Sequence, residues 1–482
     1  MAKGDNAKAL SEFGALSVRY PNDAAVRKTY VQLLILNHRL DEASQLNEAT
    51  LRTGPRDSES LVLRGQIQTQ QNHFDNAILT LRQALTDDPS NASAHFYLGV
   101  AFQRKNQIQE AEGEWHAAVR LRPDLVQAWS ALGSTAAQRG DWRTLEPIAA
   151  RLCELEPDAP DGYLFQATAK INLGDSAAAE EYLKRLVKLA PQNPLGYVKL
   201  GQLRAQQKRW AEAEDYYRQA LSHDSNSVAA IEGLVGLDLR RDRAADAVKL
   251  VQSQLDKTPE NVNLYLLLGD SQFKSGHAVE AERAFQEAVA LDRQNVNALI
   301  ALASLQASQG KSEQSIASYQ RAIELAPANV ELYLALGGVD EGQGSWESAE
   351  QAYRKALAIR PDFGPAANNL AFLLLEHGGD ANLALSLAQT ARRGLPTLPN
   401  SADTLGWAYY HGGLFSLAAP LLEDAVKRDP ANSTYHYHLG LTYQKLNESN
   451  RSHAELEKAI AINPKSRVAD QARQAMTQST SG

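Results

Sequence analysis

The chain has 482 residues, of which 44% are hydrophobic and 22% charged, so it can fold around a core. Its 57 acidic and 49 basic residues give a net charge of −8, which argues against a nucleic-acid coat and against a binder of anionic membranes. A single cysteine excludes an intrachain disulfide and a cysteine-based zinc site, and no apolar run approaches the roughly 18 residues of a membrane span.

The first predicted element is a single helix over residues 5–20, in a terminal segment bounded as 1–23. Its Ala9, Phe13 and Leu16 take the places that small and aromatic residues occupy in the second helix of the repeats described next. Two interpretations stay open: a natural cap of the array, or a chain that begins inside a longer array. Residues 1–20 lack the apolar core of a secretory signal peptide.

Residues 24–465 repeat with a period of 34, which the prolines mark and which slips by one residue late in the chain. The prolines are Pro21, Pro55, Pro89, Pro123, Pro157, Pro191, Pro259, Pro327, Pro361, Pro396, Pro430 and Pro464. A small residue, mostly glycine or alanine, lies ten residues after each of these prolines except Pro464, and in most repeats an alanine follows twelve residues later. Two small residues let two helices approach closely, and proline ends the second helix, so the spacing predicts helix hairpins.

The pattern resembles the tetratricopeptide repeat, most completely in repeat 10. That repeat carries Tyr333, Leu336, Gly337, Ala349, Tyr353, Ala356 and Pro361. The resemblance implies an all-α, right-handed superhelical solenoid of about thirteen helix–turn–helix repeats in residues 24–465. It makes residues 1–23 a half repeat with only the second helix. It also implies that the first helices line a concave face that binds ligands.

Two repeats depart from the pattern. Repeat 4 has Leu145 in place of the packing alanine and Pro147 inside its second helix, which predicts a late start or a kink of that helix. Repeat 11 carries one extra residue in its turn, at residues 377–380. Tolerated drift and a hinge with changed curvature are both open interpretations of these departures.

The last segment, residues 466–482, predicts a polar amphipathic helix that caps the array. Val468, Ala472 and Met476 are expected to lie on one side of it. Residues 477–482 are expected to fray.

No motif indicates catalysis, so we expect a protein that is not an enzyme and has no cofactor or metal. A phosphate-binding glycine loop, a nucleophile elbow and a His-Glu-x-x-His pair are all missing from the sequence. His411 lies on the first helix of repeat 12, and His436 and His438 on that of repeat 13. The latter two are two residues apart, so a helix points them in nearly opposite directions. Cys153, near the end of a helix, is expected to be buried and unreactive.

Aromatic and apolar residues at the ligand positions implied by the resemblance are the candidate partner-binding residues. They are Phe96, Tyr97, Leu164, Phe165, Phe372, Trp407, Tyr410 and Tyr437. Such residues are typical binding hot spots, although several of them can equally pack between adjacent first helices. We expect Trp407 to be exposed, with Glu376 and Lys445 flanking it. Charges on this face are mixed and give no basic track for a nucleic acid.

The leading functional hypothesis is a non-enzymatic scaffold that binds an extended peptide or a partner's helix in the concave groove. Residues 368–371, 377–380 and 402–410 also resemble, more weakly, the terminal repeats of large bacterial tetratricopeptide proteins, some of which accompany exopolysaccharide export and exosortase systems. An envelope or periplasmic component that organises polysaccharide or protein export is therefore the alternative. The regulatory array of a larger enzyme is a third possibility. Bacterial cytoplasm and periplasm both remain open, as does the oligomeric state.

Overall fold

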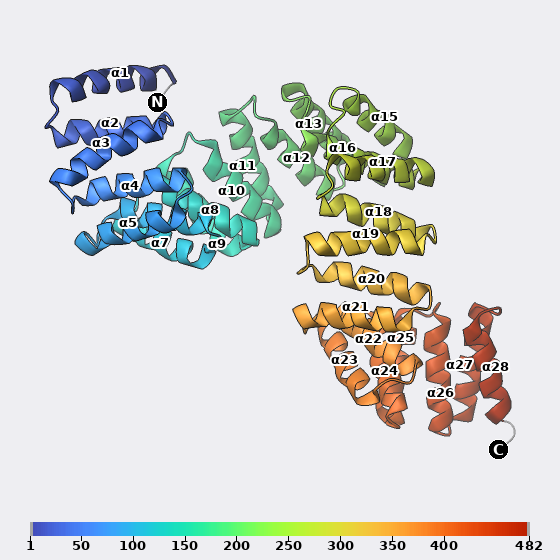
Figure 1. Cartoon of the computed structure of the whole chain (residues 1–482). Helices are drawn as coiled ribbons and strands as arrows, with labels where there is room; N and C mark the ends of the chain where they lie inside the picture. The colour runs from blue at the N-terminus through green and yellow to red at the C-terminus, as the bar shows by residue number, and fades with distance from the viewer. Residues whose placement is uncertain (1–2, 480–482) are drawn as a thin grey trace. The chain divides into compact units, whose positions relative to one another are not determined.

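The computed structural model describes residues 3–479, and over these residues it contains 28 α-helices and no β-strand. The all-α repeat solenoid predicted from the sequence is confirmed. The helices divide into two compact units, one ending at Leu237 and the other beginning at Asp238, and each unit is described by itself. Within each unit the helices follow one another as stacked hairpins (Figure 1).

The first unit holds the helices of repeats 1–6 and most of the first helix of repeat 7. They are α1 (Lys3–Arg19), α2 (Ala24–Leu36), α3 (Leu40–Thr53), α4 (Ser58–Gln70), α5 (Phe74–Asp87), α6 (Ala92–Arg104), α7 (Ile108–Leu121), α8 (Val126–Arg139), α9 (Trp142–Leu155), α10 (Pro160–Asn172), α11 (Ser176–Leu189), α12 (Pro194–Gln206), α13 (Trp210–His223) and α14 (Val228–Arg240). Even-numbered helices from α2 onward are the first helices of their repeats, and odd-numbered helices from α3 onward are the second.

The second unit holds the remaining repeats and the C-terminal helix. Its helices are α15 (Ala244–Leu255), α16 (Val262–Lys274), α17 (Ala278–Leu291), α18 (Val296–Ser308), α19 (Ser312–Leu325), α20 (Val330–Gly342), α21 (Trp346–Ile359), α22 (Gly364–Glu376), α23 (Ala381–Gly394), α24 (Pro399–His411), α25 (Phe415–Arg428), α26 (Ser433–Lys445), α27 (Ser449–Ile462) and α28 (Arg467–Ser479). Among the described residues, no helix is both long enough and apolar enough to cross a bilayer.

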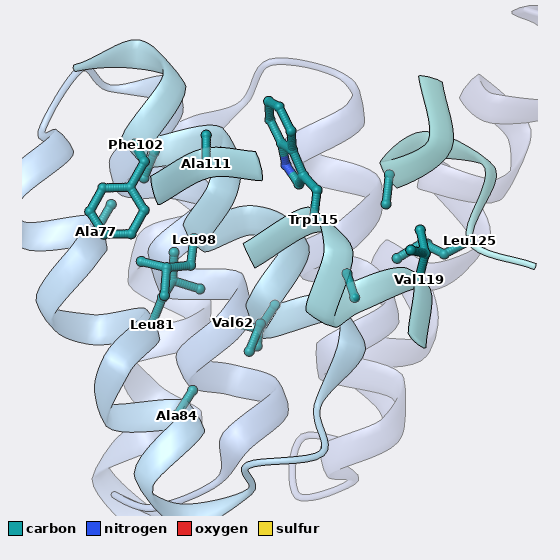
Figure 2. Close-up of a cluster of buried hydrophobic side chains, with 14 of the residues drawn as sticks. Val62, Ala77, Leu81, Ala84, Leu98, Phe102, Ala111, Trp115, Val119 and Leu125 are labelled. Atoms are coloured by element: carbon teal, nitrogen blue, oxygen red, sulfur yellow. The ribbon is translucent and has the colours of Figure 1, made fainter. Parts of the chain in front are cut away.

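Small residues bring the two helices of a hairpin together, and repeat 3 shows why. A Cβ atom on Gly99 of α6 would collide with the indole of Trp115 on α7, so the site requires glycine. Trp115 is fully buried, and its Nε1 donates to the carbonyl oxygen of Phe96 at 3.2 Å. Leu81 and Leu98 belong to the same core (Figure 2). Burying each such side chain stabilises the fold by about 1.5–3 kcal/mol.

Each connection from a first helix to a second helix contains one residue with a positive φ. These residues are His38, Asn72, Asn106, Gly140, Gly174, Lys208, Asp242, Gly276, Gly310, Gly344, Gly378, Gly413 and Asn447. Glycine adopts this left-handed conformation without a steric penalty, and asparagine and aspartate tolerate it better than most residues. They recur with the 34-residue period, so the turn geometry repeats together with the helices.

The prolines end the second helices and also anchor the first helix that follows. Helix α11 ends at Leu189, and the hydroxyl of Tyr197 on α12 donates to the carbonyl oxygen of Pro191 at 3.1 Å. Five other repeats place an aromatic or histidine side chain on the proline carbonyl six residues earlier. The pairs are His95 with Pro89, Trp129 with Pro123, Tyr163 with Pro157, Tyr333 with Pro327, and His436 with Pro430.

The late start predicted for the second helix of repeat 4 is wrong. Helix α9 begins at Trp142 and runs to Leu155, the same 14 residues that α7 and α11 span. Leu145 is fully buried against Ala136 and Ala169, and these small neighbours leave room for the larger side chain. Pro147, the sixth residue of the helix, removes only one ladder hydrogen bond. Helix α25 carries a proline inside it as well.

The extra residue of repeat 11 lies in the turn and not in a helix. Four residues, 377–380, join α22 to α23, whereas three residues join α20 to α21. Asp380 caps α23, because its Oδ1 accepts from the backbone N–H groups of Asn382 at 2.9 Å and Leu383 at 3.1 Å. The longer turn therefore ends in a side-chain cap.

The first helix, α1, packs on α2 as a second helix would. Leu10 contacts the cluster that includes Val31 and Leu34, and a Cβ atom on Gly14 would lie 3.2 Å from the hydroxyl oxygen of Tyr30. The aromatic ring of Tyr30 thus lies against the glycine of α1.

Helix α28 packs on α27 and α26 through its alanines. Ala469, Ala472 and Ala475 are buried, and Met476 packs beside them. Val468, one turn before Ala472, is half-buried and lines a cavity. The predicted fraying of residues 477–482 falls partly on residues 480–482, which lie outside the described residues.

Candidate binding grooves

The second unit contains two adjoining cavities formed by the first helices of repeats 10–13 together with α28. Their volumes are about 360 and 270 Å³, and they share Glu341, Phe372 and Thr434. We call them together the C-terminal groove. Its lining residues are Glu341, Trp346, Asn368, Asn369, Phe372, Leu373, Glu376, His377, Asn400, Asp403, Thr404, Trp407, Asn432, Thr434, Tyr435, Tyr437, His438, Arg467, Val468 and Gln471.

A stack of three rings forms one wall of this groove. The ring of Trp407 lies 3.9 Å from that of His438 at an interplanar angle of 9°, and 4.5 Å from that of Tyr410 at 14°. His438 comes from the next repeat, so the stack joins α24 to α26. Only 6% of Trp407 is exposed. The prediction of an exposed Trp407 is therefore wrong, because His438 and Tyr410 cover its two faces.

Hydrogen bonds extend this wall across two repeats to the C-terminal helix. The Nε1 atom of Trp407 donates to Oε1 of Glu376 at 3.1 Å. The other carboxylate oxygen, Oε2, accepts from the guanidinium of Arg467 at 3.3 Å. Arg467 is 75% exposed, whereas Glu376 is 22% exposed. A largely exposed cation therefore pairs with a carboxylate that Trp407 holds in the groove.

The two histidines of repeat 13 have separate carboxylate partners. Nδ1 of His438 lies 2.9 Å from Oδ1 of Asp403, and both side chains are at most 3% exposed. Nδ1 of His436 lies 2.5 Å from Oε2 of Glu455 on the second helix of the same repeat. His95 and Glu114 repeat this second pairing in repeat 3, which indicates a structural role for it. Over the described residues, no group of three or more metal-ligating side chains could hold an ion.

Tyrosine hydroxyls in and behind the groove remain protonated at neutral pH. Burial raises the pKa of Tyr410 and of Tyr437, so both keep their protons. Behind the groove, burial and the nearby carboxylate of Glu341 raise the pKa of Tyr353, whose hydroxyl donates to Glu341 at 2.8 Å. Glu341 has this neutral donor and no ion pair among the described residues.

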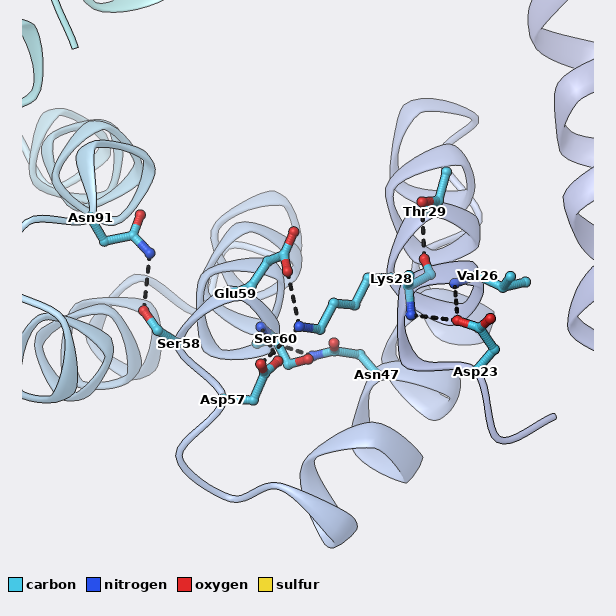
Figure 3. A network of polar contacts seen from close by, with 11 residues as sticks. Asp23, Val26, Lys28, Thr29, Asn47, Asp57, Ser58, Glu59, Ser60 and Asn91 are labelled. Atoms are coloured by element: carbon cyan, nitrogen blue, oxygen red, sulfur yellow. Dashed lines mark hydrogen bonds and ion pairs between the residues drawn. The ribbon is translucent and has the colours of Figure 1, made fainter. Parts of the chain in front are cut away.

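The first unit contains a cavity of about 430 Å³, which we call the N-terminal groove. It is lined by Gln32, Leu36, Glu59, Val62, Leu63, Gln66, Asn91, Ser93 and Tyr97. Its one carboxylate, Glu59, pairs with Nζ of Lys28 at 2.9 Å, and the same Nζ lies 2.8 Å from Asp57 (Figure 3). The carboxylate that lines this groove is thus ion-paired with a lysine beside it.

The predicted site residues separate into two groups. Phe372, Trp407 and Tyr437 line the C-terminal groove, and Tyr97 lines the N-terminal groove. The others fill space between helices: Tyr410 stacks behind Trp407, Phe96 packs at 5.0 Å on Tyr97, Leu164 belongs to the core of repeats 5 and 6, and Phe165 lies against Gly133.

Sequence reasoning missed several contributors to the C-terminal groove, among them Trp346, Asn400 and Arg467. Trp346, at the start of α21, stacks on His377 at 4.2 Å, and Asn400 and Arg467 line the cavities. Had the 34-residue period been continued into residues 466–482, α28 would have been placed where the first helix of a further repeat belongs, next to the ligand positions of repeat 13.

Cys153 is half-buried, where the sequence predicted a buried residue. Burial raises the pKa of its thiol to about 11, so it remains protonated at neutral pH and is a poor nucleophile.

Comparison with protein families matches the repeats along most of the chain. Models described as tetratricopeptide repeat match residues 1–67, 166–228, 204–270, 300–363 and 404–467, and a model described as TPR repeat matches residues 65–106. Together these matches cover more than half of the chain.

Curated relatives and solved structures resemble the chain only distantly. Protein O-mannosyl-transferase TMTC1 of Mus musculus is 27% identical over 143 residues, and the chloroplastic protein PYG7 of Arabidopsis thaliana, which has tetratricopeptide repeats, is 24% identical over 107 residues. These matches cover 29% and 21% of this chain, but only 15% and 36% of the two relatives. The Cut9–Hcn1 hetero-tetramer of the APC/C matches with a TM-score of 0.45 and 13% identity, over 97% of this chain and 98% of that chain.

Proposed function

The chain belongs to the tetratricopeptide repeat family, and we propose that it is a non-enzymatic scaffold that binds an extended peptide segment of a partner protein in the C-terminal groove. Members of this family generally act as protein-interaction scaffolds, and solenoids of this kind use extended concave surfaces for binding. The proposal names the groove of repeats 10–13 as the place where recognition occurs.

The observation that carries the proposal is the lining of this groove. The half-buried ring of Phe372 lines one cavity together with the amides of Asn369 and Asn400, and the half-buried ring of Tyr437 lines the adjoining cavity. Amide side chains bond the N–H and C=O groups of an extended backbone, and aromatic rings hold the side chains between them. The wall behind them is fixed by the stack on Trp407, so little conformational entropy is lost when a ligand binds.

The test is selection from a random peptide library displayed on phage, followed by fluorescence polarisation of synthetic copies of the selected peptides. Asn400→Arg places a long side chain into the groove from an exposed position on α24. Gln389→Arg adds the same side chain to an exposed position on α23, outside the cavities, and serves as the matched control.

We expect Asn400→Arg to weaken binding at least about tenfold, because the new side chain fills space that the peptide needs. Gln389→Arg should leave the affinity unchanged, and both variants should unfold at the same urea concentration as the native chain. Equal affinities of the two variants, or a selection that enriches no peptide, would contradict the proposal.

A further inference from the structure

More acidic than basic side chains line the C-terminal groove. Three carboxylates, those of Glu341, Glu376 and Asp403, line its cavities against one guanidinium, that of Arg467. Asp403 is already hydrogen-bonded to His438 at 2.9 Å, so its carboxylate has a partner within the protein. Glu341 lines both cavities and has no ion pair among the described residues. One negative charge in the groove thus lacks a compensating cation.

A cation already lies on the second available carboxylate. The guanidinium of Arg467 reaches Glu376 from the start of α28, 91 residues away in the sequence. Its side chain is 75% exposed and the contact is a long 3.3 Å, so water and salt screen it and it is easily displaced. This contact shows that an arginine head group fits beside Glu376 in the groove.

A buried acceptor without a donor lies in the adjoining cavity. Oδ1 of Asn368 has no hydrogen-bond partner, although the residue is only 5% exposed and lines this cavity. Its Nδ2 lies 3.5 Å from Oδ1 of Asn369, which orients the amide. Leaving a buried acceptor unpaired is unfavourable, so the site favours a ligand that brings an N–H group.

We propose that the C-terminal groove selects a peptide with a basic side chain, arginine or lysine, whose cation lies between Glu341 and Glu376 while a neighbouring N–H group of the peptide donates to Asn368. The rings of Phe372 and Tyr437 border the cavity and cover the aliphatic part of that side chain. The ligand displaces Arg467 from Glu376. This inference rests on the proposed function and adds the chemical class of the ligand to it.

The same phage selection tests the inference through the residues that it enriches. We expect one position of the selected peptides to be arginine or lysine. A peptide in which citrulline replaces that arginine keeps the shape of the side chain but loses its charge, and it should bind about tenfold more weakly.

The matched protein variants are two double substitutions. Glu341→Gln with Glu376→Gln removes both charges, yet each glutamine oxygen can still accept from Tyr353 or Trp407, so the wall is retained. Glu287→Gln with Glu324→Gln removes two charges from exposed positions on the second helices of repeats 8 and 9.

The groove variant should lose about tenfold in affinity for the arginine peptide and little for the citrulline peptide, and the control should lose neither. Arg467→Ala should strengthen binding of the arginine peptide, because it removes the internal competitor. Enriched peptides without a basic residue, or equal losses in the two double variants, would overturn this inference while leaving the proposed function intact. Enrichment of no peptide would overturn both.

Discussion

The N-terminal and C-terminal grooves are built on the same hairpin frame, yet they hold different chemistry. In the N-terminal groove, Lys28 forms an ion pair with Glu59, and the lining is otherwise polar and aliphatic around Tyr97. In the C-terminal groove, a carboxylate without an ion pair stands beside a buried aromatic stack. The periodic residues determine the frame, whereas the residues between them determine what a groove can bind. The repeat alone therefore does not identify a binding site.

The largest expected effect compares the stability lost by truncating Trp407 in the C-terminal groove with that lost by truncating Tyr97 in the N-terminal groove. Trp407→Ala should lower the free energy of unfolding of repeats 11–13 by about 4 kcal/mol, because it removes a buried indole and its stacking partners. Tyr97→Ala, which truncates a half-buried ring, should cost about 1–2 kcal/mol. Hydrogen exchange within each unit measures both losses. Equal losses would mean that the two grooves do not differ in how firmly their walls are packed.

An intermediate effect tests whether the helix hairpins of the two units are packed equally tightly around their glycines. A Cβ atom on Gly337 would lie 2.5 Å from the ring of Tyr353, so Gly337→Ala should lower the free energy of unfolding by about 1–2 kcal/mol. Gly99→Ala, which meets Trp115 in the first unit, should cost a similar amount.

The adjacent Gly338 provides the control for this comparison. A Cβ atom there meets nothing within 4 Å, so Gly338→Ala should stabilise the helix by up to about 1 kcal/mol through helix propensity alone. Urea unfolding of the variants gives these differences. If Gly99→Ala left the free energy of unfolding unchanged while Gly337→Ala lowered it, the hairpins of the two units would be packed differently.

The smallest expected effect concerns the charge balance of the N-terminal groove. Burial raises the pKa of Asp57, but the hydrogen bonds from Lys28 and Ser60 outweigh it and hold that pKa below its usual value. Burial likewise lowers the pKa of Lys28, but Asp57 and Glu59 outweigh it and raise that pKa. The carboxylate contribution to stability is therefore present above about pH 4 and is lost as the pH falls through the folded-state pKa of Asp57.

The lysine contribution is present below about pH 10.4 and is lost as the pH rises through the folded-state pKa of Lys28. Lys28→Gln should accordingly lower the free energy of unfolding by about 1 kcal/mol at pH 7, and the difference from the native chain should shrink as the pH falls through the folded-state pKa of Asp57. Urea titrations at several pH values measure it. A difference that stays constant with pH would show that the ion pairs do not contribute.

The fold was predictable from the sequence because each requirement of the hairpin is repeated. Gly99 and Gly337 occupy the same column, and in both repeats a large ring from the second helix fills the space that glycine leaves. The groove was less predictable, because its contacts join different repeats. The burial of Trp407 depends on His438 in the next repeat, and the charge on Glu376 is met by Arg467, 91 residues away. The 34-residue period places the helices side by side, but it does not say which side chains meet.

The extra residue of repeat 11 shows where such an array tolerates a change in length. An added residue inside an α-helix turns every later side chain of that helix by about 100°, and so moves an apolar stripe off its partner. Here the addition lies between Gly378, which adopts the left-handed conformation, and the cap at Asp380, so α23 starts afresh from its own cap. The turn therefore absorbs the added residue without shifting the side chains of either helix. Insertions at the turns of the other hairpins should be tolerated in the same way, whereas a single inserted residue in α24 or α26 would dismantle the groove.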